Sequence, residues 1–267
     1  MIGDDPLDLG GQVAFVTGAG QSAGRAIALT LAKHNAGGVV VNDFVAERAD
    51  AVVAEIQALG VRAVAAPCDV GDHAAVKAAV ARAAETLGPA TLLVNNAGNA
   101  GPTAKIQPGP WFWETDPADW DRFLRTNLYG VMNCCHAVMP AMVARGKGRI
   151  VTIVSDAGRV GDSKLAAYAA AKAGAAGLVR ALAREGGRFG VTCNAISLAA
   201  LEPVMPPEQK EAFLASEQAK AMASRYVIRR LGRPDDVAKL ALFLCSDAAE
   251  WITGQTYPLN GGYTFAI

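Results

Sequence analysis

The sequence predicts a single α/β domain, in which a doubly wound sheet of seven mostly parallel strands carries helices on both faces. Short runs rich in β-branched residues alternate with longer Ala-rich stretches along the 267 residues, which is the order of successive βαβ units. The strand runs lack polar alternation, as expected for strands that helices cover on both faces. No linker, repeat or low-complexity segment divides the chain, so residues 1–267 are expected to form one domain.

Each predicted strand is followed by a predicted helix over most of the chain. The strands are Val13–Thr17, Val39–Asn42, Val61–Ala66, Leu92–Asn95, Ile150–Val154, Val191–Ile196 and Thr256–Leu259. The helices are Arg25–Lys33, Glu47–Leu59, Ala74–Leu87, Trp120–Ala144, Ala166–Arg188 and Pro234–Leu244. Pro140 lies inside the fourth helix, where its missing N–H predicts a kink or an end.

Two proline-rich stretches interrupt this alternation. Residues 99–118 include Trp111-Phe112-Trp113, and residues 198–232 separate the sixth strand from the last helix. Both begin after a predicted strand, at the sheet edge where open parallel sheets bind their ligands. They are therefore expected to be the walls of a substrate pocket. The consecutive aromatic residues suit either an apolar, ring-containing substrate or contact with a partner subunit.

The composition argues against several classes of protein. The 25 basic and 25 acidic residues balance, and no basic stripe indicates a nucleic-acid partner. No apolar run approaches the roughly 18 residues of a membrane span. The five cysteines share no CxxC spacing, so neither a disulfide framework nor a metal site is predicted. Reduced thiols and an acidic, non-apolar start favour a cytoplasmic location.

A glycine-rich turn follows the first strand and opens the first helix. Residues 17–25 have the sequence Thr-Gly-Ala-Gly-Gln-Ser-Ala-Gly-Arg. Glycines allow a tight turn, and they let backbone N–H groups approach a pyrophosphate at the positive end of a helix. Asp43 ends the second strand, 19 residues after Gly24, which is close to the spacing of an acid that accepts from a ribose hydroxyl.

The choice of cofactor depends on the charges near that acid. Asp43 would repel the 2′-phosphate of NADP at a cost of about 1–4 kcal/mol. Gln21 supplies no positive charge within the glycine turn, and Phe44 supplies none directly after the acid. The sequence therefore predicts NAD as the cofactor.

The order of motifs resembles that of the short-chain dehydrogenase/reductase family over nearly the whole chain. The motifs are Thr17-Gly18-x-x-x-Ser22-x-Gly24, Cys68-Asp69-Val70, Asn95-Asn96-Ala97-Gly98, Leu231-Gly232-Arg233-Pro234 and Asn260-Gly261-Gly262. The resemblance implies a Rossmann fold and an NAD site. The residues that it places at the cofactor are Gly18, Gln21, Ser22, Ala23, Asp43, Asp69, Val70, Asn96, Ala97, Gly98, Tyr168, Lys172 and Leu201.

A tyrosine and a lysine lie four residues apart in the fifth predicted helix. This separation places Tyr168 and Lys172 on one face, about 6 Å apart along the helix axis. A phenol has a reference pKa of about 10, and each unit of depression corresponds to about 1.4 kcal/mol. The ammonium of Lys172 together with an oxidised nicotinamide is expected to lower the tyrosine pKa by about two to three units.

The resemblance assigns a role to each of four residues. It implies that Tyr168 is the acid/base and that Ser155 hydrogen-bonds the substrate oxygen. It also implies that Lys172 binds the nicotinamide ribose and that Asn127 holds a water that relays the proton. The expected reaction is hydride transfer between a nicotinamide and a secondary alcohol or its ketone. Two alternatives remain, a 3-oxoacyl-thioester reductase and a non-catalytic NAD(H)-binding sensor or scaffold.

The chain departs from the family pattern at the phosphate and nicotinamide ends. Ser22 replaces the middle glycine of the turn, Leu198-Ala199 replaces the usual Pro-Gly, and Pro203 replaces a threonine that commonly contacts the cofactor. The resemblance also implies a homotetramer or homodimer. Many small residues between Ala166 and Gly177 would allow another helix to approach closely, and the tetramer would use the segment Gly262–Ile267.

Overall fold

The computed structural model of the chain describes residues 5–98 and 108–265. Within them, seven strands form one sheet in the order β3-β2-β1-β4-β5-β6-β7. The strands are β1 (Val13–Val16), β2 (Gly38–Val41), β3 (Ala63–Ala65), β4 (Leu92–Asn95), β5 (Gly148–Ser155), β6 (Val191–Leu198) and β7 (Thr256–Leu259). All neighbouring strands pair in parallel. The predicted seven-stranded, doubly wound α/β fold is confirmed.

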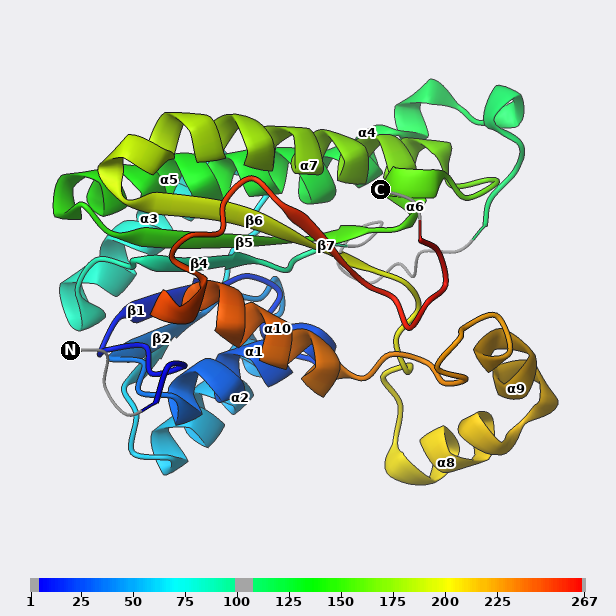
Figure 1. The fold of residues 1–267 in the computed structure, drawn as a ribbon, viewed down its shortest axis with the longest axis horizontal. Helices are drawn as coiled ribbons and strands as arrows, with labels where there is room; N and C mark the ends of the chain where they lie inside the picture. The colour runs from blue at the N-terminus through cyan, green and yellow to red at the C-terminus, as the bar shows by residue number, and fades with distance from the viewer. Residues whose placement is uncertain (1–4, 99–107, 266–267) are drawn as a thin grey trace.

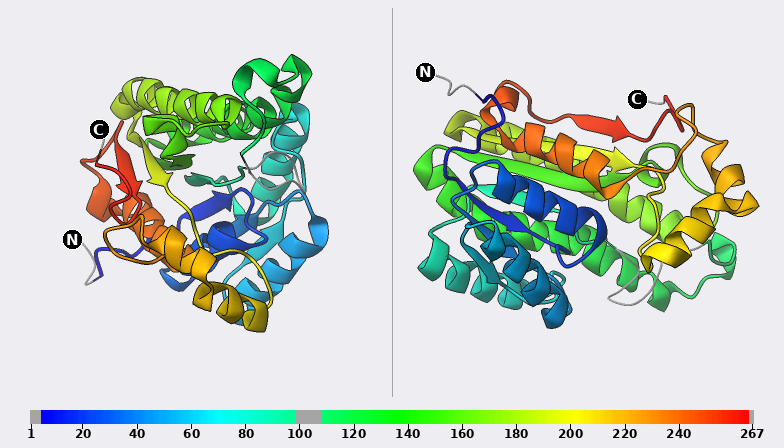
Figure 2. Two further views of the ribbon diagram at one scale, coloured as in Figure 1. Left: turned by 90° about the vertical axis from the view of Figure 1, so that its right-hand side faces the viewer. Right: turned by 90° about the horizontal axis from the view of Figure 1, so that it is seen from below.

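Helices cover the two faces of the sheet as separate layers (Figures 1 and 2). One layer contains α1 (Ser22–Lys33), α2 (Ala46–Ala58) and α10 (Pro234–Cys245). The other contains α3 (His73–Leu87), α5 (Gly130–Arg145) and α7 (Ala166–Gly186). The strand order reverses between the neighbouring strands β1 and β4. A crevice at such a switch point is the usual ligand site of this fold.

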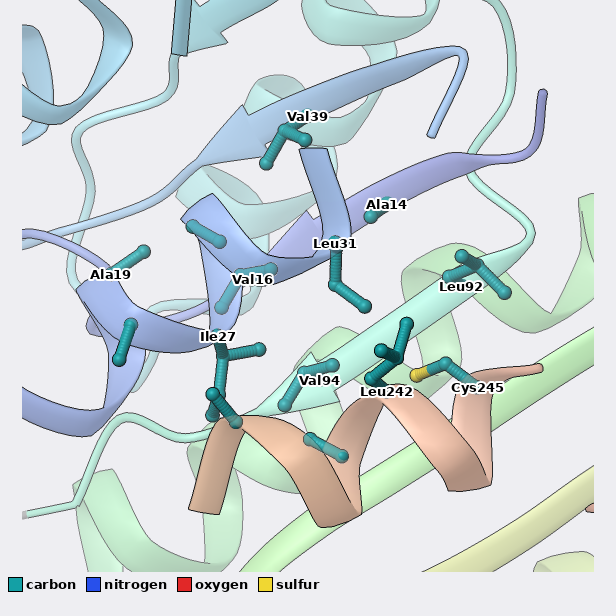
Figure 3. Packing of buried hydrophobic residues seen from close by; sticks show 14 of the residues in the cluster. Ala14, Val16, Ala19, Ile27, Leu31, Val39, Leu92, Val94, Leu242 and Cys245 are labelled. Carbon is teal, nitrogen blue, oxygen red and sulfur yellow. The ribbon is translucent and has the colours of Figure 1, made fainter. Parts of the chain in front are cut away.

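Alternate residues of each strand supply the two hydrophobic cores. In β1, Ala14 and Val16 belong to the core beneath α1 and α10, whereas Val13 and Phe15 belong to the core on the opposite face. Figure 3 shows the first core, in which side chains from α1 and α10 meet those of β1 and β4. Because both faces are buried, the strands need apolar residues at every position, as the sequence shows.

The fourth predicted helix, Trp120–Ala144, is wrong as a single regular element. The segment consists of α4 (Asp121–Leu124), a π-helical turn (Arg125–Tyr129) and then α5. Pro140 does not end the helix, because α5 continues to Arg145. A π turn inserts an extra residue into the helical register, and such turns often occur at functional sites.

The stretch 198–232 contains two helices that the sequence analysis does not predict. It contains α8 (Pro207–Ala215) and α9 (Glu217–Ala223), which project beyond the carboxyl end of the sheet (Figure 1). No residue of α8 is buried, and Ala219 is the buried residue of α9. Of the other predicted pocket wall, residues 99–107 lie outside the described residues, and residues 108–118 include a 3-10 turn over Phe112–Glu114.

The remaining short elements connect the strands and helices. They are α6 (Ala157–Val160) and the 3-10 turns Pro117–Asp119, Gly187–Phe189 and Asp247–Ala249. No described helix combines the length and the apolar character that crossing a membrane requires.

Candidate active site

A cleft of about 320 Å³ lies at the carboxyl ends of the central strands. Every residue that the sequence places at the cofactor contributes to its lining, namely Gly18, Gln21, Ser22, Ala23, Asp43, Asp69, Val70, Asn96, Ala97, Gly98, Tyr168, Lys172 and Leu201. Ser155 also lines the cleft. The fold therefore brings together residues from both halves of the sheet at the switch point.

The glycine turn after β1 packs against the turn after β4. Asn96 Nδ2 donates to the carbonyl oxygens of Thr17 and Gly18, at 3.0 Å each. In return, the Thr17 hydroxyl accepts from the backbone N–H groups of Asn96 and Ala97, also at 3.0 Å. A Cβ on Gly24 would lie 2.0 Å from the Gly18 oxygen. Only glycine at position 24 allows this approach of the two backbone segments.

The amino end of α1 faces this turn and suits a phosphate group. Gly18 has a φ of +59°, which glycine adopts without strain. The N-cap residue, Gln21, makes no side-chain cap hydrogen bond. Backbone N–H groups of the first helical turn are therefore available to an anion, and the helix dipole favours one there. These residues fit the pyrophosphate of a dinucleotide.

Ser22 keeps the backbone conformation of a glycine. Its φ is +48°, in the left-handed region that a side chain makes unfavourable. The substitution of the family glycine by serine therefore leaves the shape of the turn in place at the cost of local strain.

Asp43 and Arg48 determine the charge at the adenosine end. The Asp43 carboxylate is buried, and it accepts from the backbone N–H groups of Gly20 and Val45 at 3.0 Å each. Arg48 of α2 also lines the cleft, and a Cβ on Gly20 would lie 2.5 Å from Arg48 Cβ. Sequence reasoning missed this cation. Its only signal is a basic residue in the first turn of the helix after the acid.

Asp69 occupies the next strand end along the cleft. Its Oδ1 accepts from the Gly71 N–H at 2.8 Å, and its Oδ2 pairs with Arg125 Nη2 at 3.1 Å. Both side chains are partly exposed. These two contacts hold the carboxylate at the edge of the cleft.

The four predicted catalytic residues come from three elements and gather at the other end of the cleft. Ser155 ends β5, Tyr168 and Lys172 belong to α7, and Asn127 lies in the π turn. A Cβ on Gly98 would lie 2.7 Å from Lys172 Nζ and 2.9 Å from Asn127 Oδ1. Asn127 does not line the cleft itself but lies directly behind Gly98.

Hydrogen bonds to the backbone fix the orientation of three of these side chains. Ser155 Oγ accepts from the Ala157 N–H at 3.2 Å. Lys172 Nζ donates to the Ile153 oxygen at 2.9 Å, and it lies 5.9 Å from the centre of the Tyr168 ring. Asn127 Nδ2 donates to the Phe123 oxygen at 2.9 Å.

Burial shifts the pKa of both groups on α7 away from the charged forms. It raises the pKa of Tyr168, and a hydrogen bond with Ser155 opposes that shift. It lowers the pKa of Lys172 to about 8. At pH 7 the lysine therefore still carries its proton, whereas the tyrosine is a neutral phenol.

The aromatic stretch packs partly against itself and partly beside α7. Trp111 stacks on Trp113 with ring centres 5.4 Å apart, and Phe112 stacks on Trp120 at 5.3 Å. A small cavity of about 80 Å³ separates this stretch from the start of α7, and Phe112, Trp120 and Tyr168 line it. Trp113 is 77% exposed, so its outer face remains available to a ligand or a subunit.

Known proteins resemble the chain over almost its full length. A family model described as Enoyl-(Acyl carrier protein) reductase matches residues 18–264. The chain is 38% identical over 267 residues to 7alpha-hydroxysteroid dehydrogenase of Escherichia coli (strain K12), with 98% of each chain covered. It is 36% identical over 249 residues to the 3-oxoacyl-[acyl-carrier-protein] reductase FabG of Staphylococcus aureus (strain N315), covering 93% of this chain and 96% of the relative.

A solved structure gives the same result. The crystal structure of a gluconate 5-dehydrogenase from Burkholderia cenocepacia J2315, in complex with NADP and tartrate, superposes with a TM-score of 0.86 at 31% identity. The match covers 98% of this chain and 99% of that one. The glycine turn and cleft agree with the nicotinamide cofactor of such enzymes. The chain therefore belongs to the short-chain dehydrogenase/reductase family of nicotinamide-dependent oxidoreductases.

Proposed function

We propose that the protein is an NAD-dependent oxidoreductase that interconverts a secondary alcohol and its ketone. The observation that carries this proposal is the meeting of Ser155, Tyr168, Lys172 and Asn127 at one end of a cleft whose other end fits a dinucleotide. When bound, the nicotinamide supplies or takes up the hydride. The side chains of the protein orient the substrate and move the proton.

Ser155 and Tyr168 act on the substrate oxygen. Ser155 Oγ accepts from the Ala157 N–H. Its own hydrogen, which hydrogen-bonds Tyr168 without substrate, can be donated to the substrate oxygen instead. Tyr168 takes the hydroxyl proton during oxidation and returns it during reduction. Two fixed hydroxyls at the reacting oxygen stabilise the charge that develops there in the transition state.

Lys172 favours the phenolate that oxidation requires. Burial raises the pKa of Tyr168, so the phenolate needs a positive charge nearby to form at neutral pH. The ammonium of Lys172 supplies that charge one helical turn away. Its hydrogen bond to Ile153 uses one of three N–H donors, which leaves two for a ribose hydroxyl. Asn127 would hold the water that carries the proton onward.

The preference for NAD rests on a balance between two charges. Asp43 is buried and fixed by two backbone N–H groups, so solvent screens its charge only weakly. Arg48 is half-buried at the same end of the cleft and would attract a 2′-phosphate. We infer that the buried acid dominates, although the Burkholderia enzyme was crystallised with NADP.

A reductase that acts on 3-oxoacyl thioesters is the second candidate. It is favoured by the similarity to the Staphylococcus aureus 3-oxoacyl-[acyl-carrier-protein] reductase. Both reactions use the same proton chemistry at Tyr168 and differ in the substrate that the pocket walls admit. A non-catalytic sensor of NAD(H) would bind the dinucleotide without turnover.

We also propose a cytoplasmic homotetramer or homodimer. All five cysteines are free thiols, and Cys134, Cys135, Cys193 and Cys245 are buried, as suits a reducing compartment. The small residues at the start of α7 would allow close approach of a second copy. Light scattering of the purified protein would measure the assembly.

The test is NADH or NADPH absorbance at 340 nm with purified protein. Cyclic and aromatic alcohols, their ketones and 3-oxoacyl thioesters form the substrate panel, each with both cofactors. We expect turnover of alcohols or ketones, with kcat/KM at least about tenfold higher for NAD. Equal use of NADP would refute the cofactor assignment. Turnover of thioesters alone would favour the second candidate, and binding of NADH without turnover would favour a sensor.

Two matched variants separate the charges at the adenosine end. Asp43→Asn removes the acid with little change in size, and Arg48→Ala removes the cation. We expect the first variant to lower the preference for NAD and the second to raise it. The same direction of change in both variants would contradict this explanation of selectivity.

A further inference from the structure

The carboxylate of Asp156 is buried directly beside the candidate active site. Asp156 follows Ser155 in the chain, and only 2% of its surface is exposed. Its Oδ1 accepts from Ser197 Oγ at 2.6 Å and from Arg159 Nη1 at 2.9 Å. Its Oδ2 accepts from Asn260 Nδ2 at 2.6 Å. A buried carboxylate with three donors is costly to disrupt, because each donor would lose its partner away from water.

These hydrogen bonds join three strand ends that are far apart in the sequence. Ser197 belongs to β6, and Asn260 follows β7 directly. The backbone N–H of Asp156 donates to the Leu198 oxygen at 2.9 Å. Asn260 also donates to the Thr264 oxygen at 3.0 Å. One side chain thus links the ends of β5, β6 and β7 to the carboxyl-terminal segment 260–264.

The orientation of the Ser155 hydroxyl depends on this anchor. The donor to Ser155 Oγ is the N–H of Ala157, which lies one residue beyond Asp156. The direction of that N–H is set by the turn 155–157, and the carboxylate of Asp156 holds the middle of the turn. A shift of the turn would therefore change where the Ser155 hydroxyl points.

We propose that Asp156 is a positioning residue, which holds the turn 155–157 so that the Ser155 hydroxyl faces the substrate oxygen. This inference rests on the proposed function, because it assumes that Ser155 donates to that oxygen. Asp156 does not line the cleft, so its effect on the reaction would pass through Ser155. Through Asn260, the carboxyl-terminal segment 260–264 helps to hold Asp156 in place.

A double-mutant cycle between Asp156→Asn and Ser155→Ala tests the proposal. In Asp156→Asn, an NH₂ group that can only donate replaces one of the two carboxylate oxygens. It then faces a side chain that also donates, so the anchor is weakened without a change in size. We expect Asp156→Asn to lower kcat about tenfold to a hundredfold, with the KM for NAD changed by less than about threefold. In the Ser155→Ala background the same change should lower kcat by less than about threefold. Equal losses in both backgrounds would overturn the proposal.

A swapped pair provides the rescue experiment. Asp156→Asn combined with Asn260→Asp restores a donor facing an acceptor between β5 and β7. Asn260→Asp alone also removes the donor to the Thr264 oxygen, so it is measured as the control for that loss. The kcat of the double variant should exceed the value expected if the losses of the two single variants were additive. Additive losses would show that the hydrogen bond between these two residues does not position Ser155.

Asp247→Asn is the matched control at the other end of β5. Asp247 accepts from Arg149 Nη2 at 3.0 Å and from Lys147 Nζ at 2.9 Å, at the amino end of the strand. This variant should lower the melting temperature and leave kcat within about threefold of the unmodified protein. A loss of kcat equal to that of Asp156→Asn would show that any weakened anchor of β5 suffices.

Hydrogen exchange tests the anchor even if no substrate is found. Asp156→Asn should speed amide exchange in residues 155–161 and 256–264, whereas Asp247→Asn should not. Unchanged exchange in these segments would overturn the anchoring role. A protein that turns over no alcohol or ketone, but shows this exchange, would instead reject the proposed function.

Discussion

The two ends of the cleft are built by opposite means. At the phosphate end, side chains are absent where two backbone segments meet, and a Cβ on Gly24 would collide with Gly18. At the catalytic end, the polar side chains of Asn127 and Lys172 are buried and tied to backbone carbonyls. The first end therefore depends on backbone geometry and size, and the second depends on charge and hydrogen bonding.

Ser22 and Gly98 are the instructive exceptions to this division. Ser22 puts a side chain into the phosphate turn at a φ of +48°. Gly98 puts a side-chain-free position into the catalytic end, where Lys172 Nζ and Asn127 Oδ1 fill the space of a Cβ. The phosphate end thus contains one side chain, and the catalytic end contains one glycine. Substitutions can test whether backbone geometry or side-chain chemistry matters at each end.

The largest effect is expected at the catalytic end from Tyr168→Phe. The substitution removes only the hydroxyl, so dinucleotide binding at the phosphate end should be preserved. A general acid–base group contributes about a hundredfold to ten-thousandfold, and kcat should fall by at least about a hundredfold. Steady-state rates at 340 nm, with NADH affinity measured by fluorescence, check both parts. A loss below about tenfold would reject the role of the tyrosine.

The second effect is a pH dependence of stability caused by Lys172. Burial lowers the lysine pKa to about 8 from a reference value of 10.5. Between these pH values the unfolded chain binds the proton and the folded protein does not, so this group makes folding more favourable as the pH rises. The gain is up to about 3 kcal/mol, most of it above pH 8.

Lys172→Met isolates this contribution by removing the charge. Buried thiols have raised pKa values and act in the opposite direction at high pH, but they are common to both proteins. Tyr168 also has a raised pKa, and because Lys172 affects it, both proteins are compared in a Tyr168→Phe background. The free energy of unfolding of the protein with Lys172 minus that of the Lys172→Met variant should therefore rise between pH 8 and 10.5. Urea unfolding at several pH values measures it, and a constant difference would show that the lysine is not buried as described.

The smallest effect is expected at the phosphate end from Ser22→Gly. Glycine relieves the strain of the positive φ but increases the freedom of the unfolded chain, so the net gain in stability should be about 1 kcal/mol or less. Ser22→Ala keeps the strain and removes the hydroxyl. Both variants lack the hydroxyl, so weaker binding of NAD by both would show that the hydroxyl contacts the cofactor. If the alanine variant were more stable than the glycine variant, the positive φ at position 22 would not be a source of strain.

Local patterns predicted the parts of the molecule that short-range physics determines. The strands were placed to within about two residues, because continuous apolar runs are what a doubly covered sheet requires. Helical spacing placed Tyr168 and Lys172 on one face of a helix, whereas their catalytic roles were implied by the resemblance to the family. The glycine turn was recognisable because strand, glycines and helix are adjacent in the chain.

The features that the sequence did not reveal depend on residues far apart in the chain, or on helices without a regular pattern of apolar residues. The helix α8 buries none of its residues, so it leaves no apolar stripe to recognise. The π turn at Arg125–Tyr129 has no residue signature of its own. Arg48 enters the cleft only because α2 packs beside the glycine turn. The partners of Asp156 lie up to 104 residues away.

The most direct test of the account is a crystal structure of the protein with NAD and an alcohol that it oxidises. The account predicts that the substrate oxygen lies within hydrogen-bonding distance, about 2.6–3.2 Å, of both Tyr168 Oη and Ser155 Oγ. It also predicts the pyrophosphate at the amino end of α1. A substrate oxygen bound away from these two hydroxyls would contradict the proposed chemistry.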